Sequence, residues 1–470
     1  MDNTKGAFRR MVFSSILFLF RFFPAAMLIY FVVPKKLKNL AIFLLSLFFY
    51  SWGEPKYFPI MIASVLVDYF VGRGIQRFWR NKAICKWLLA ASMVFNLGML
   101  GFFKYTGFFV ENLNALLGLS LRAPNITLPI GISFYTFQTM SYSIDVYRGK
   151  VKAEKNIIDF AAFVTLFPQL IAGPIVRYAD ISKELKERTV NLDQISDGVA
   201  TFIMGLGKKV LIANNIGALW TEISETLGFG GISAPLAWMG AAAFTLQIYF
   251  DFSGYSQMAI GLGKMMGFSF PQNFDFPYIS KSFTEFWRRW HMTLGSWFRE
   301  YLYFPLGGSR VDSRARLYFN LFVVWFCTGF WHGASWNFIL WGLFFLVFLV
   351  IEKTFLLPYL NKGRVWPHIY VLFFLLISWV IFAVTDLSQL GVMLGRMFSF
   401  SAGSDWIYYL RNYAVTFAVA ILFSTPLPWK LYCKVKDSTA VNLALLGGVL
   451  VLSVAYLVDA TYNPFLYFRF

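Results

Sequence analysis

Long apolar runs alternate with short polar or basic segments along almost the whole chain. Examples of these runs are residues 11–33, 40–52 and 317–331. A helix that crosses a bilayer core needs about 20 mainly apolar residues, so the pattern predicts an all-α polytopic membrane protein with roughly 10–12 transmembrane helices. Because no internal repeat, linker or low-complexity stretch interrupts the pattern, we expect one domain over residues 1–470.

The basic segments between the apolar runs predict how the chain is threaded through the membrane. Lys and Arg collect in cytoplasmic loops, so residues 73–86 and 309–316 are expected inside and the acidic segment 221–235 outside. Residues 156–176 leave one basic loop and return to another, which predicts a re-entrant hairpin. Such backbone is tolerated at membrane depth only where it is buried in protein or lines a cavity.

Composition supports the membrane class and excludes several others. Hydrophobic residues make up 58% of the chain and charged residues 14%, whereas soluble domains carry about 25% charged residues. The net charge of +18 comes from short, separated basic clusters, which favours cytoplasmic loops over a nucleic-acid partner. Three widely spaced cysteines form neither a disulfide framework nor a metal-binding pattern, so no metal site is expected.

Two predicted helices carry polar side chains within apolar surroundings, where such groups are costly and therefore candidates for function. Their polar faces hold Gln138, Tyr142 and Asp145 in one helix, and Gln247, Asp251 and Tyr255 in the other. We expect Asp251 to pair with Arg288, Arg289 or a histidine. Interhelical hydrogen bonding is the alternative role of both sets.

The segment 285–310 is unusually polar for this chain. Interpreted as one helix from residue 283 to 297, it places Trp287 and Trp290 on an apolar stripe, and Arg288 and His291 on another face. An amphipathic anchor at the membrane surface explains the tryptophans and arginines. It does not explain the histidine, so His291 is a candidate functional residue.

A second candidate, His332, lies within the apolar tract 317–351. This tract of about 35 residues is too long for one spanning helix and too short for two full ones. It predicts two short helices that meet near mid-depth, with Gly329 and Gly333 allowing close approach. A buried histidine with a purely structural role is the alternative.

Signatures of soluble enzymes are absent from the sequence. It has no phosphate-binding P-loop, no GxSxG nucleophile turn and no HExxH zinc motif. The short glycine patterns at 205–209 and 261–267 are interpreted as helix-packing sites rather than phosphate sites.

Several segments, in order, resemble the membrane-bound O-acyltransferase family, and in particular its bacterial polysaccharide O-acetyltransferase branch. They are "FYSWGEPKY", "FPQLIAGPIVRY", "DFSGYSQMAIGLGKMMGF", "PQNFDFPYISKSFTEFWRRWHMTLGSWFREYLYFPLGG", "FWHGASWNFILWG" and the terminal "NPFLYFRF". The resemblance spans nearly the whole chain. One departure is the segment of residues 1–10 ahead of Met11, where family members commonly begin.

The resemblance implies a ring of helices around a central tunnel, in a multi-pass protein of the bacterial cytoplasmic membrane. The family's catalytic histidine falls on His332 and its second important histidine on His291. Arg288, Arg289, Asn273 and Trp336 are assigned to substrate binding, and Gln138, Asp251 and Tyr255 to the support of the site.

The implied reaction carries an acetyl group from a cytoplasmic donor, acetyl coenzyme A, across the membrane for O-acetylation of a cell-surface or extracellular polysaccharide. The acceptor is an alginate-like or other exopolysaccharide, or peptidoglycan. No permanently bound cofactor is expected. The expected partners are membrane lipid and an extracytoplasmic SGNH-like acetyltransferase. His332 serves either as general base or as transient acyl carrier. Alternatives are D-alanyl transfer to teichoic acid from a carrier protein and, in another class, solute transport.

Overall fold

The computed structural model describes residues 11–124, 126–459 and 466. Within these residues every regular element is a helix, which confirms the all-α class. Six helical segments of the described residues are long and apolar enough to cross a membrane, so the chain is a multi-pass membrane protein. These segments are Phe58–Arg77, Lys82–Leu117, Trp336–Lys362, Trp366–Ala383, Asp405–Phe423 and Thr439–Asp459.

The expected ten to twelve spans stay a prediction. Two other apolar helices, α3 (Lys38–Gly53) and α7 (Ile132–Tyr147), contain 16 residues each. Their length of about 24 Å is less than the thickness of a bilayer core of about 30 Å. Shorter helices of this kind need neighbouring protein to cover their ends.

The chain forms two compact units. One contains residues 1–202 and 256–271, and the other contains residues 203–255 and 272–470. Their boundaries fall inside two helices, α11 (Leu192–Gly207) and α13 (Ala234–Met265). The expected single domain over residues 1–470 stays a prediction.

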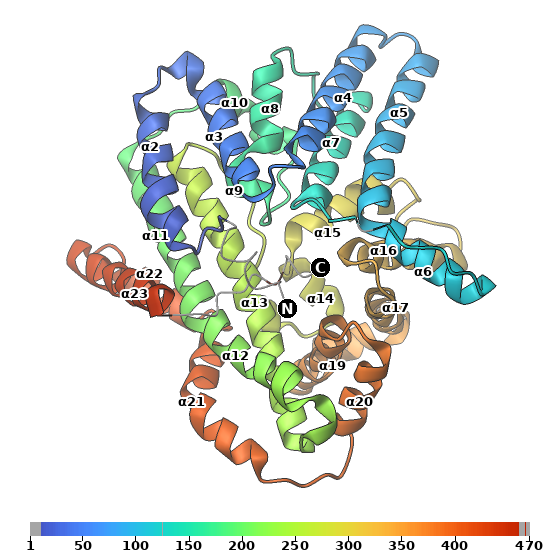
Figure 1. Ribbon diagram of the computed structural model, residues 1–470, viewed down its shortest axis with the longest axis vertical. Coiled ribbons are helices and arrows are strands. Elements are labelled where there is room, and N and C mark those ends of the chain that lie inside the picture. The colour runs from blue at the N-terminus through green and yellow to red at the C-terminus, as the bar shows by residue number, and fades with distance from the viewer. Residues whose placement is uncertain (1–10, 125, 460–465, 467–470) are drawn as a thin grey trace. The chain divides into compact units, whose positions relative to one another are not determined.

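The first unit contains most of the blue and cyan helices of Figure 1. Besides α3 and α7, these helices are α2 (Phe23–Val32), α4 (Phe58–Arg77), α5 (Lys82–Leu100), α6 (Thr106–Leu117), α8 (Ile157–Thr165), α9 (Phe167–Leu170) and α10 (Tyr178–Lys186). The helices α4, α5 and α7 pack against one another, as Figure 1 shows.

A buried carboxylate joins these three helices. Asp68 of α4 accepts hydrogen bonds from Ser92 of α5 at 2.5 Å, from Asn96 of α5 at 2.7 Å and from Ser143 of α7 at 2.6 Å. Buried polar groups are stable only when hydrogen-bonded, and here neighbouring helices supply the donors. The cluster therefore has the structural role that the sequence led us to consider for polar residues in the spans.

The polar face predicted on α7 has structural contacts of a similar kind. The hydroxyl of Tyr142 accepts a hydrogen bond from the backbone of Glu154 at 2.9 Å, and the carboxylate of Asp145 lies 3.9 Å from the ammonium group of Lys150. Gln138 is fully buried in the same helix. These contacts attach α7 to the loop that follows it.

The predicted re-entrant segment is irregular and buried. The short helices α8 and α9 are followed by non-helical backbone, and every residue from 160 to 176 is buried. This meets the condition for irregular backbone at membrane depth, because protein surrounds its polar groups. Whether the segment enters and leaves the membrane on the same side stays a prediction.

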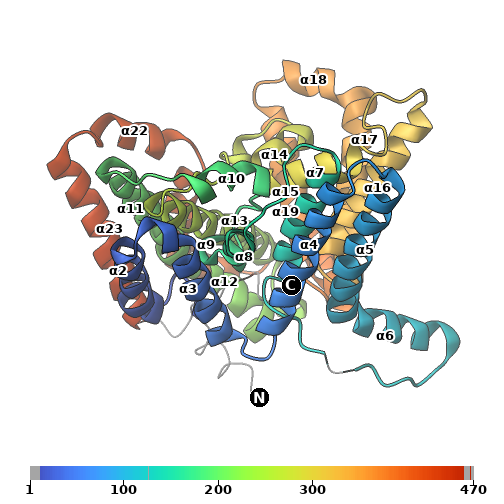
Figure 2. The same ribbon diagram turned by 90° about the horizontal axis from the view of Figure 1, so that it is seen from above.

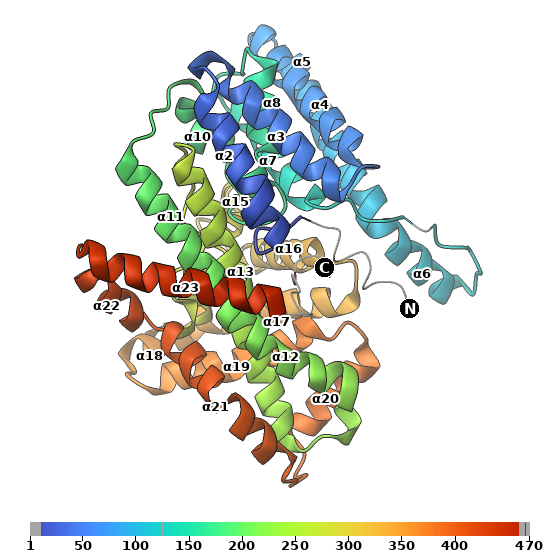
Figure 3. The same ribbon diagram turned by 60° about the vertical axis from the view of Figure 1, so that its left-hand side comes forward.

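The second unit contains the remaining helices. They are α12 (Asn215–Thr221), α14 (Phe283–Arg289), α15 (Met292–Phe298), α16 (Arg314–His332), α17 (Trp336–Ile351), α18 (Leu357–Lys362), α19 (Trp366–Ala383), α20 (Leu387–Met397), α21 (Asp405–Phe423), α22 (Leu427–Val435) and α23 (Thr439–Asp459). Figure 2 shows α16 and α17 side by side, and Figure 3 shows α21, α22 and α23 in orange to red.

Aromatic side chains dominate the core of this second unit. Trp290 packs against Trp379 with ring centroids 4.8 Å apart, and Trp341 lies 5.1 Å from Phe345 and 5.9 Å from Trp379. Large aromatic rings bury much area and hold specific tilted or edge-on geometries. The core therefore consists of closely packed aromatic rings, and both candidate histidines contact aromatic residues of this unit.

Candidate active site

His332 is the last residue of α16, at the turn of a helical hairpin. The tract 317–351 is broken at residues 333–335, as expected from its length. The two helices are longer than predicted: α16 has 19 residues, and the helical segment that begins with α17 continues to Lys362. The break is confirmed, but the expectation of two short helices is wrong, because the helices extend beyond the apolar tract at both ends.

Glycines allow the two helices of this hairpin to pack closely against each other. A Cβ atom at Gly329 would clash with the carbonyl oxygen of Phe338, and one at Gly342 would clash with the carbonyl oxygen of Trp325. The backbones of α16 and α17 therefore approach more closely than larger residues allow. This close packing fixes the position of His332 at the end of α16.

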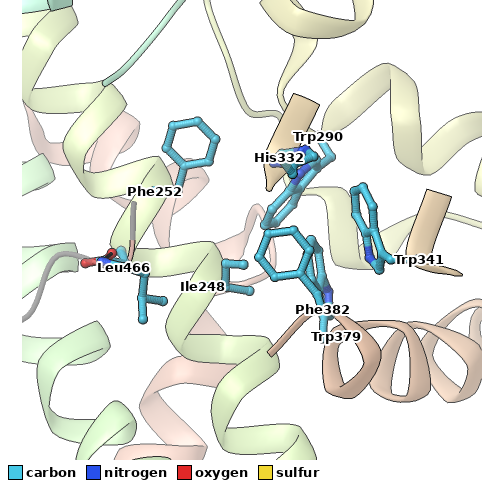
Figure 4. A pocket seen from close by; sticks show the side chains of 9 residues that line it. Ile248, Phe252, Trp290, His332, Trp341, Trp379, Phe382 and Leu466 are labelled. Atoms are coloured by element: carbon cyan, nitrogen blue, oxygen red, sulfur yellow. Dashed lines mark hydrogen bonds between the residues drawn. The ribbon is translucent and has the colours of Figure 1, made fainter. Parts of the chain in front are cut away.

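The side chain of His332 faces a small, mainly aromatic cavity (Figure 4). Its ring meets Trp341 edge-on at 5.0 Å and Phe382 edge-on at 5.3 Å, measured between centroids. The cavity volume is about 20 Å³, enough for about one water molecule. Nine residues line it: Ile248, Asp251, Phe252, Trp290, His332, Trp341, Trp379, Phe382 and Leu466.

His291 lies between two short helices, not inside one. The single helix expected over 283–297 is wrong: α14 ends at Arg289 and α15 begins at Met292. His291 has a left-handed backbone conformation with φ of 45°, which costs a non-glycine residue about 1–2 kcal/mol. Strained residues of this kind cluster at functional sites, where the surrounding structure holds them in place.

Asn273 fixes the proton position on His291. The side-chain oxygen of Asn273 accepts hydrogen bonds from the backbone N–H of Thr293 at 3.3 Å and from its hydroxyl at 2.9 Å. The same oxygen lies 3.1 Å from Nδ1 of His291. Because this oxygen is an acceptor, Nδ1 must carry the proton, and the lone pair is on Nε2. Asn273, which we assigned to substrate binding, thus contacts His291 in this structure.

Burial determines the charge of this histidine. His291 is 1% exposed, and burial lowers the pKa of its imidazole to about 3. A neutral imidazole with its lone pair on Nε2 can accept a hydrogen bond at neutral pH, but it is too weak a base to hold a proton there.

Two aromatic residues connect the candidate histidines. The ring of Trp331 lies 5.0 Å from His332 and 6.3 Å from His291. Phe252 meets His291 edge-on at 4.7 Å and also lines the cavity at His332. The structure therefore brings His291 and His332 into one aromatic cluster, although 40 residues separate them in sequence.

Asp251 lies at the same cavity, but its predicted partner is wrong. Its carboxylate forms a salt bridge with Lys209 at 2.5 Å, not with Arg288, Arg289 or a histidine. Lys209 belongs to η4 (Lys208–Asn214), a π-helical continuation of α11. Because Gly254 of α13 packs on the backbone of Gly205, these two helices approach closely enough for the pair to form.

The supporting residues have different locations. Tyr255 is fully buried one helical turn after Asp251, in the second unit. Gln138 belongs to the first unit, whereas both candidate histidines belong to the second. The supporting roles of these residues stay predictions.

The two predicted substrate-binding arginines differ in their contacts. Arg289 binds the Asp275 carboxylate at 2.9 Å, the Asp275 carbonyl oxygen at 3.1 Å and Glu285 at 2.9 Å. Arg288 is exposed, and no salt bridge to it occurs within the described residues. Arg289 is therefore held by carboxylates, whereas Arg288 is accessible to a ligand.

Trp336, also assigned to substrate binding, starts α17 and is 49% exposed. It is not among the nine residues that line the cavity at His332. A contact with substrate therefore requires an approach from outside this cavity, and its role stays a prediction.

Glu352 is a buried residue that the sequence interpretation missed. It follows α17 and accepts hydrogen bonds from the backbone N–H groups of Phe283 at 2.6 Å and Thr284 at 2.9 Å. The hydroxyl of Thr284 also donates to it at 2.7 Å. Glu352 thus satisfies the first turn of α14 and ties the hairpin of His332 to the segment of His291. No pattern near Glu352 in the sequence signals this distant capping contact.

No cluster of three or more potential metal-ligating His, Cys, Asp or Glu side chains occurs in the described part of the chain. The candidate site is built from two imidazoles, a carboxylate and aromatic rings. Imidazoles in such surroundings are suited to proton transfer or to brief attachment of an acyl group.

Comparisons with known proteins agree with this chemistry. The family model "membrane-bound O-acyltransferase family" matches residues 151–394. The chain is 39% identical to a probable alginate O-acetylase AlgI of Pseudomonas putida, over 98% of this chain and 100% of the relative. It is 35% identical to a peptidoglycan O-acetyltransferase of Helicobacter pylori, over 82% of this chain and 80% of the relative.

A more distant match is the teichoic acid D-alanyltransferase of Streptococcus thermophilus. It is 30% identical over 50% of this chain and 60% of the relative. The family match covers more than half of the chain and includes His291, His332 and the segments around them. The protein is therefore an acyltransferase that belongs to the membrane-bound O-acyltransferase family.

Proposed function

We propose that the protein transfers an acetyl group from cytoplasmic acetyl coenzyme A for O-acetylation of a cell-surface polysaccharide. The observation that carries the proposal is the place of His332, at the turn of the hairpin and facing a small aromatic cavity. Its match over nearly the whole chain to a probable alginate O-acetylase supports acetyl as the transferred group. The proposed cytoplasmic donor requires a membrane that borders the cytoplasm, so the proposal includes a location in the bacterial cytoplasmic membrane.

In the proposed reaction, His332 removes the proton from an acceptor hydroxyl. The hydroxyl oxygen forms a bond to the acetyl carbonyl carbon, the carbon–sulfur bond of the thioester breaks, and the proton passes from the imidazole to the departing thiolate. Alternatively, Nε2 or Nδ1 of His332 takes the acetyl group first and passes it to the hydroxyl. Burial among aromatic rings excludes bulk water, which would otherwise hydrolyse the acetyl donor.

His291 supports this step as a neutral residue. Asn273 holds its proton on Nδ1, so Nε2 is available as an acceptor. We propose that an SGNH-like acetyltransferase outside the membrane completes transfer to the polysaccharide. A hydroxyl acceptor on such a partner, or on the polymer itself, fits the same chemistry.

The test is purified protein in detergent or vesicles with labelled acetyl coenzyme A, with and without a polysaccharide acceptor. Label in the acceptor supports the proposal. D-Alanine transfer from a carrier protein without acetyl transfer would instead favour the D-alanyl branch. Transfer of label by neither route, with solute uptake by vesicles, would favour a transporter.

Arg288 is expected to attract the phosphates of the donor. Arg288→Glu should raise the KM for acetyl coenzyme A by about tenfold with little change in kcat, because a phosphate contact of about 1.4 kcal/mol corresponds to a factor of ten. Steady-state kinetics at several salt concentrations measure this. Arg289→Glu is the matched comparison, and it should reduce the yield of folded protein because it faces Asp275 and Glu285. An unchanged KM in Arg288→Glu would remove Arg288 from the donor site.

A further inference from the structure

The salt bridge between Lys209 and Asp251 is buried to an unusual degree. Lys209 is 1% exposed and Asp251 is 2% exposed. Burying two charges costs several kcal/mol per ion, and replacement of such pairs by apolar residues is often neutral or stabilising. Stability alone is therefore a weak reason for a buried ion pair at this position.

The two ends of the pair have different further contacts. The ammonium group of Lys209 also donates to the side-chain oxygen of Asn214 at 2.7 Å, within the same π-helical turn. The second carboxylate oxygen of Asp251 accepts the backbone N–H of Leu466 at 3.0 Å. One oxygen of Asp251 thus binds the cation, and the other binds a residue 215 positions later in the chain.

The side chain of Leu466 is part of the cavity wall at His332. It is 4% exposed, and Figure 4 shows it with Ile248 and Phe252 on the side of the cavity away from Trp341. Asp251 lines the same cavity. The ion pair is therefore linked through Asp251 to Leu466, and the side chain of Leu466 contacts the cavity at His332.

We propose that Lys209 is a positioning residue, which holds the carboxylate of Asp251 against the backbone of Leu466 and so keeps Leu466 in the wall of the His332 cavity. Lys209 compensates the charge of Asp251 and leaves its second oxygen directed at the Leu466 N–H. Without the cation, the carboxylate is no longer held in this geometry. Leu466 then leaves the wall, and water enters beside His332.

Thiol labelling measures this docking without reference to activity. The three native cysteines, Cys85, Cys327 and Cys433, are replaced by alanine, and Leu466→Cys is introduced into the full-length protein. N-ethylmaleimide should label the new thiol slowly. Adding Lys209→Met should speed labelling by about tenfold or more, as expected for the loss of one hydrogen bond to a charged group.

Two further variants serve as controls for charge and for position. Lys209→Arg retains a cation and should retain slow labelling. Lys208→Met removes a neighbouring charge that has no salt bridge within the described residues, and it should also leave labelling slow. Rapid labelling of the introduced thiol in the background that keeps Lys209, or equal rates with and without Lys209→Met, would overturn the proposal.

The double variant Lys209→Met/Asp251→Leu separates positioning from stability. It removes both buried charges, so it should restore the membrane level of the protein even if Lys209→Met alone folds poorly. Because it also removes the acceptor for the Leu466 N–H, labelling should stay fast and acetyl transfer should stay low. Recovery of slow labelling and of acetyl transfer would show that the pair is only structural.

The link from docking to acetyl transfer rests on the proposed function, and the two failures are distinguishable. If the parent protein transfers no acetyl group, the proposed function fails, while labelling still decides whether Lys209 holds Leu466. If the parent is active and labelling is insensitive to Lys209, only the positioning role fails.

Discussion

Replacement of His332 by alanine should abolish acetyl transfer while the protein still accumulates in the membrane. General acid–base catalysis contributes about a hundredfold to ten-thousandfold to rate, and an acyl-carrier role makes the loss larger still. The measurement is acetylation of surface polymer in cells that lack the native copy, together with initial rates of the purified variant. Protein levels in membranes are compared by immunoblot.

The chain offers a matched control for this change. It contains three histidines, and His368 lies near the start of α19, away from the residues that line the cavity. His368→Ala should retain near-normal acetylation at an equal protein level. Near-normal acetylation by His332→Ala would remove His332 from catalysis, and a loss in both variants would point to folding.

The position of His332 is the part of the site that the sequence predicts best. The length of the apolar tract requires a break, and the small residues Gly329 and Gly333 indicate where two helices meet closely. The structure places the break at 333–335 and packs Gly329 against Phe338. Length and residue size are local properties of the sequence, which is why this inference needs no knowledge of the surrounding fold.

The conformation of His291 could not be predicted in the same way. Residues 283–297 contain no proline, and their single glycine, Gly295, lies after the break. The helix is interrupted because Asn273 binds the backbone of Met292 at 2.9 Å and the side chain of His291 at 3.1 Å. A distant residue therefore overrides the local helical periodicity, which a pattern within the segment cannot reveal.

The partner of Asp251 also depends on contacts between segments that are distant in sequence, in this case on which helices pack together. The glycine pattern at 205–209 predicts a packing site, and Gly205 does pack against Gly254. The sequence does not say which helix meets the pattern, so it offered the nearby arginines as partners in place of Lys209. Arg289 proves to be a structural contact for a local reason, because it pairs with Glu285 four residues earlier in the same helix.

Acetyl transfer should occur from one side of the membrane to the other. The basic loops predict that the donor face lies inside the cell, and coenzyme A carries several charges that cannot cross hydrocarbon at low cost. Only the acetyl group then needs to pass the site at His332. Acceptors in the compartment opposite the donor should therefore receive nearly all of the label.

Sealed vesicles that contain the protein in a known orientation test this directly. Labelled acetyl coenzyme A is supplied on the side of the Arg288 segment, with one polysaccharide acceptor enclosed and a second, distinguishable acceptor outside. Vesicles with His332→Ala serve as the control for leakage. Leakage is measured as labelled coenzyme that enters these vesicles, because its entry does not need His332. The orientation of the protein in the vesicles is determined by labelling a cysteine introduced at Ser309. Label confined to the acceptor that shares the donor's compartment would mean that the enzyme modifies substrates on one side only, and the membrane-crossing role would be wrong.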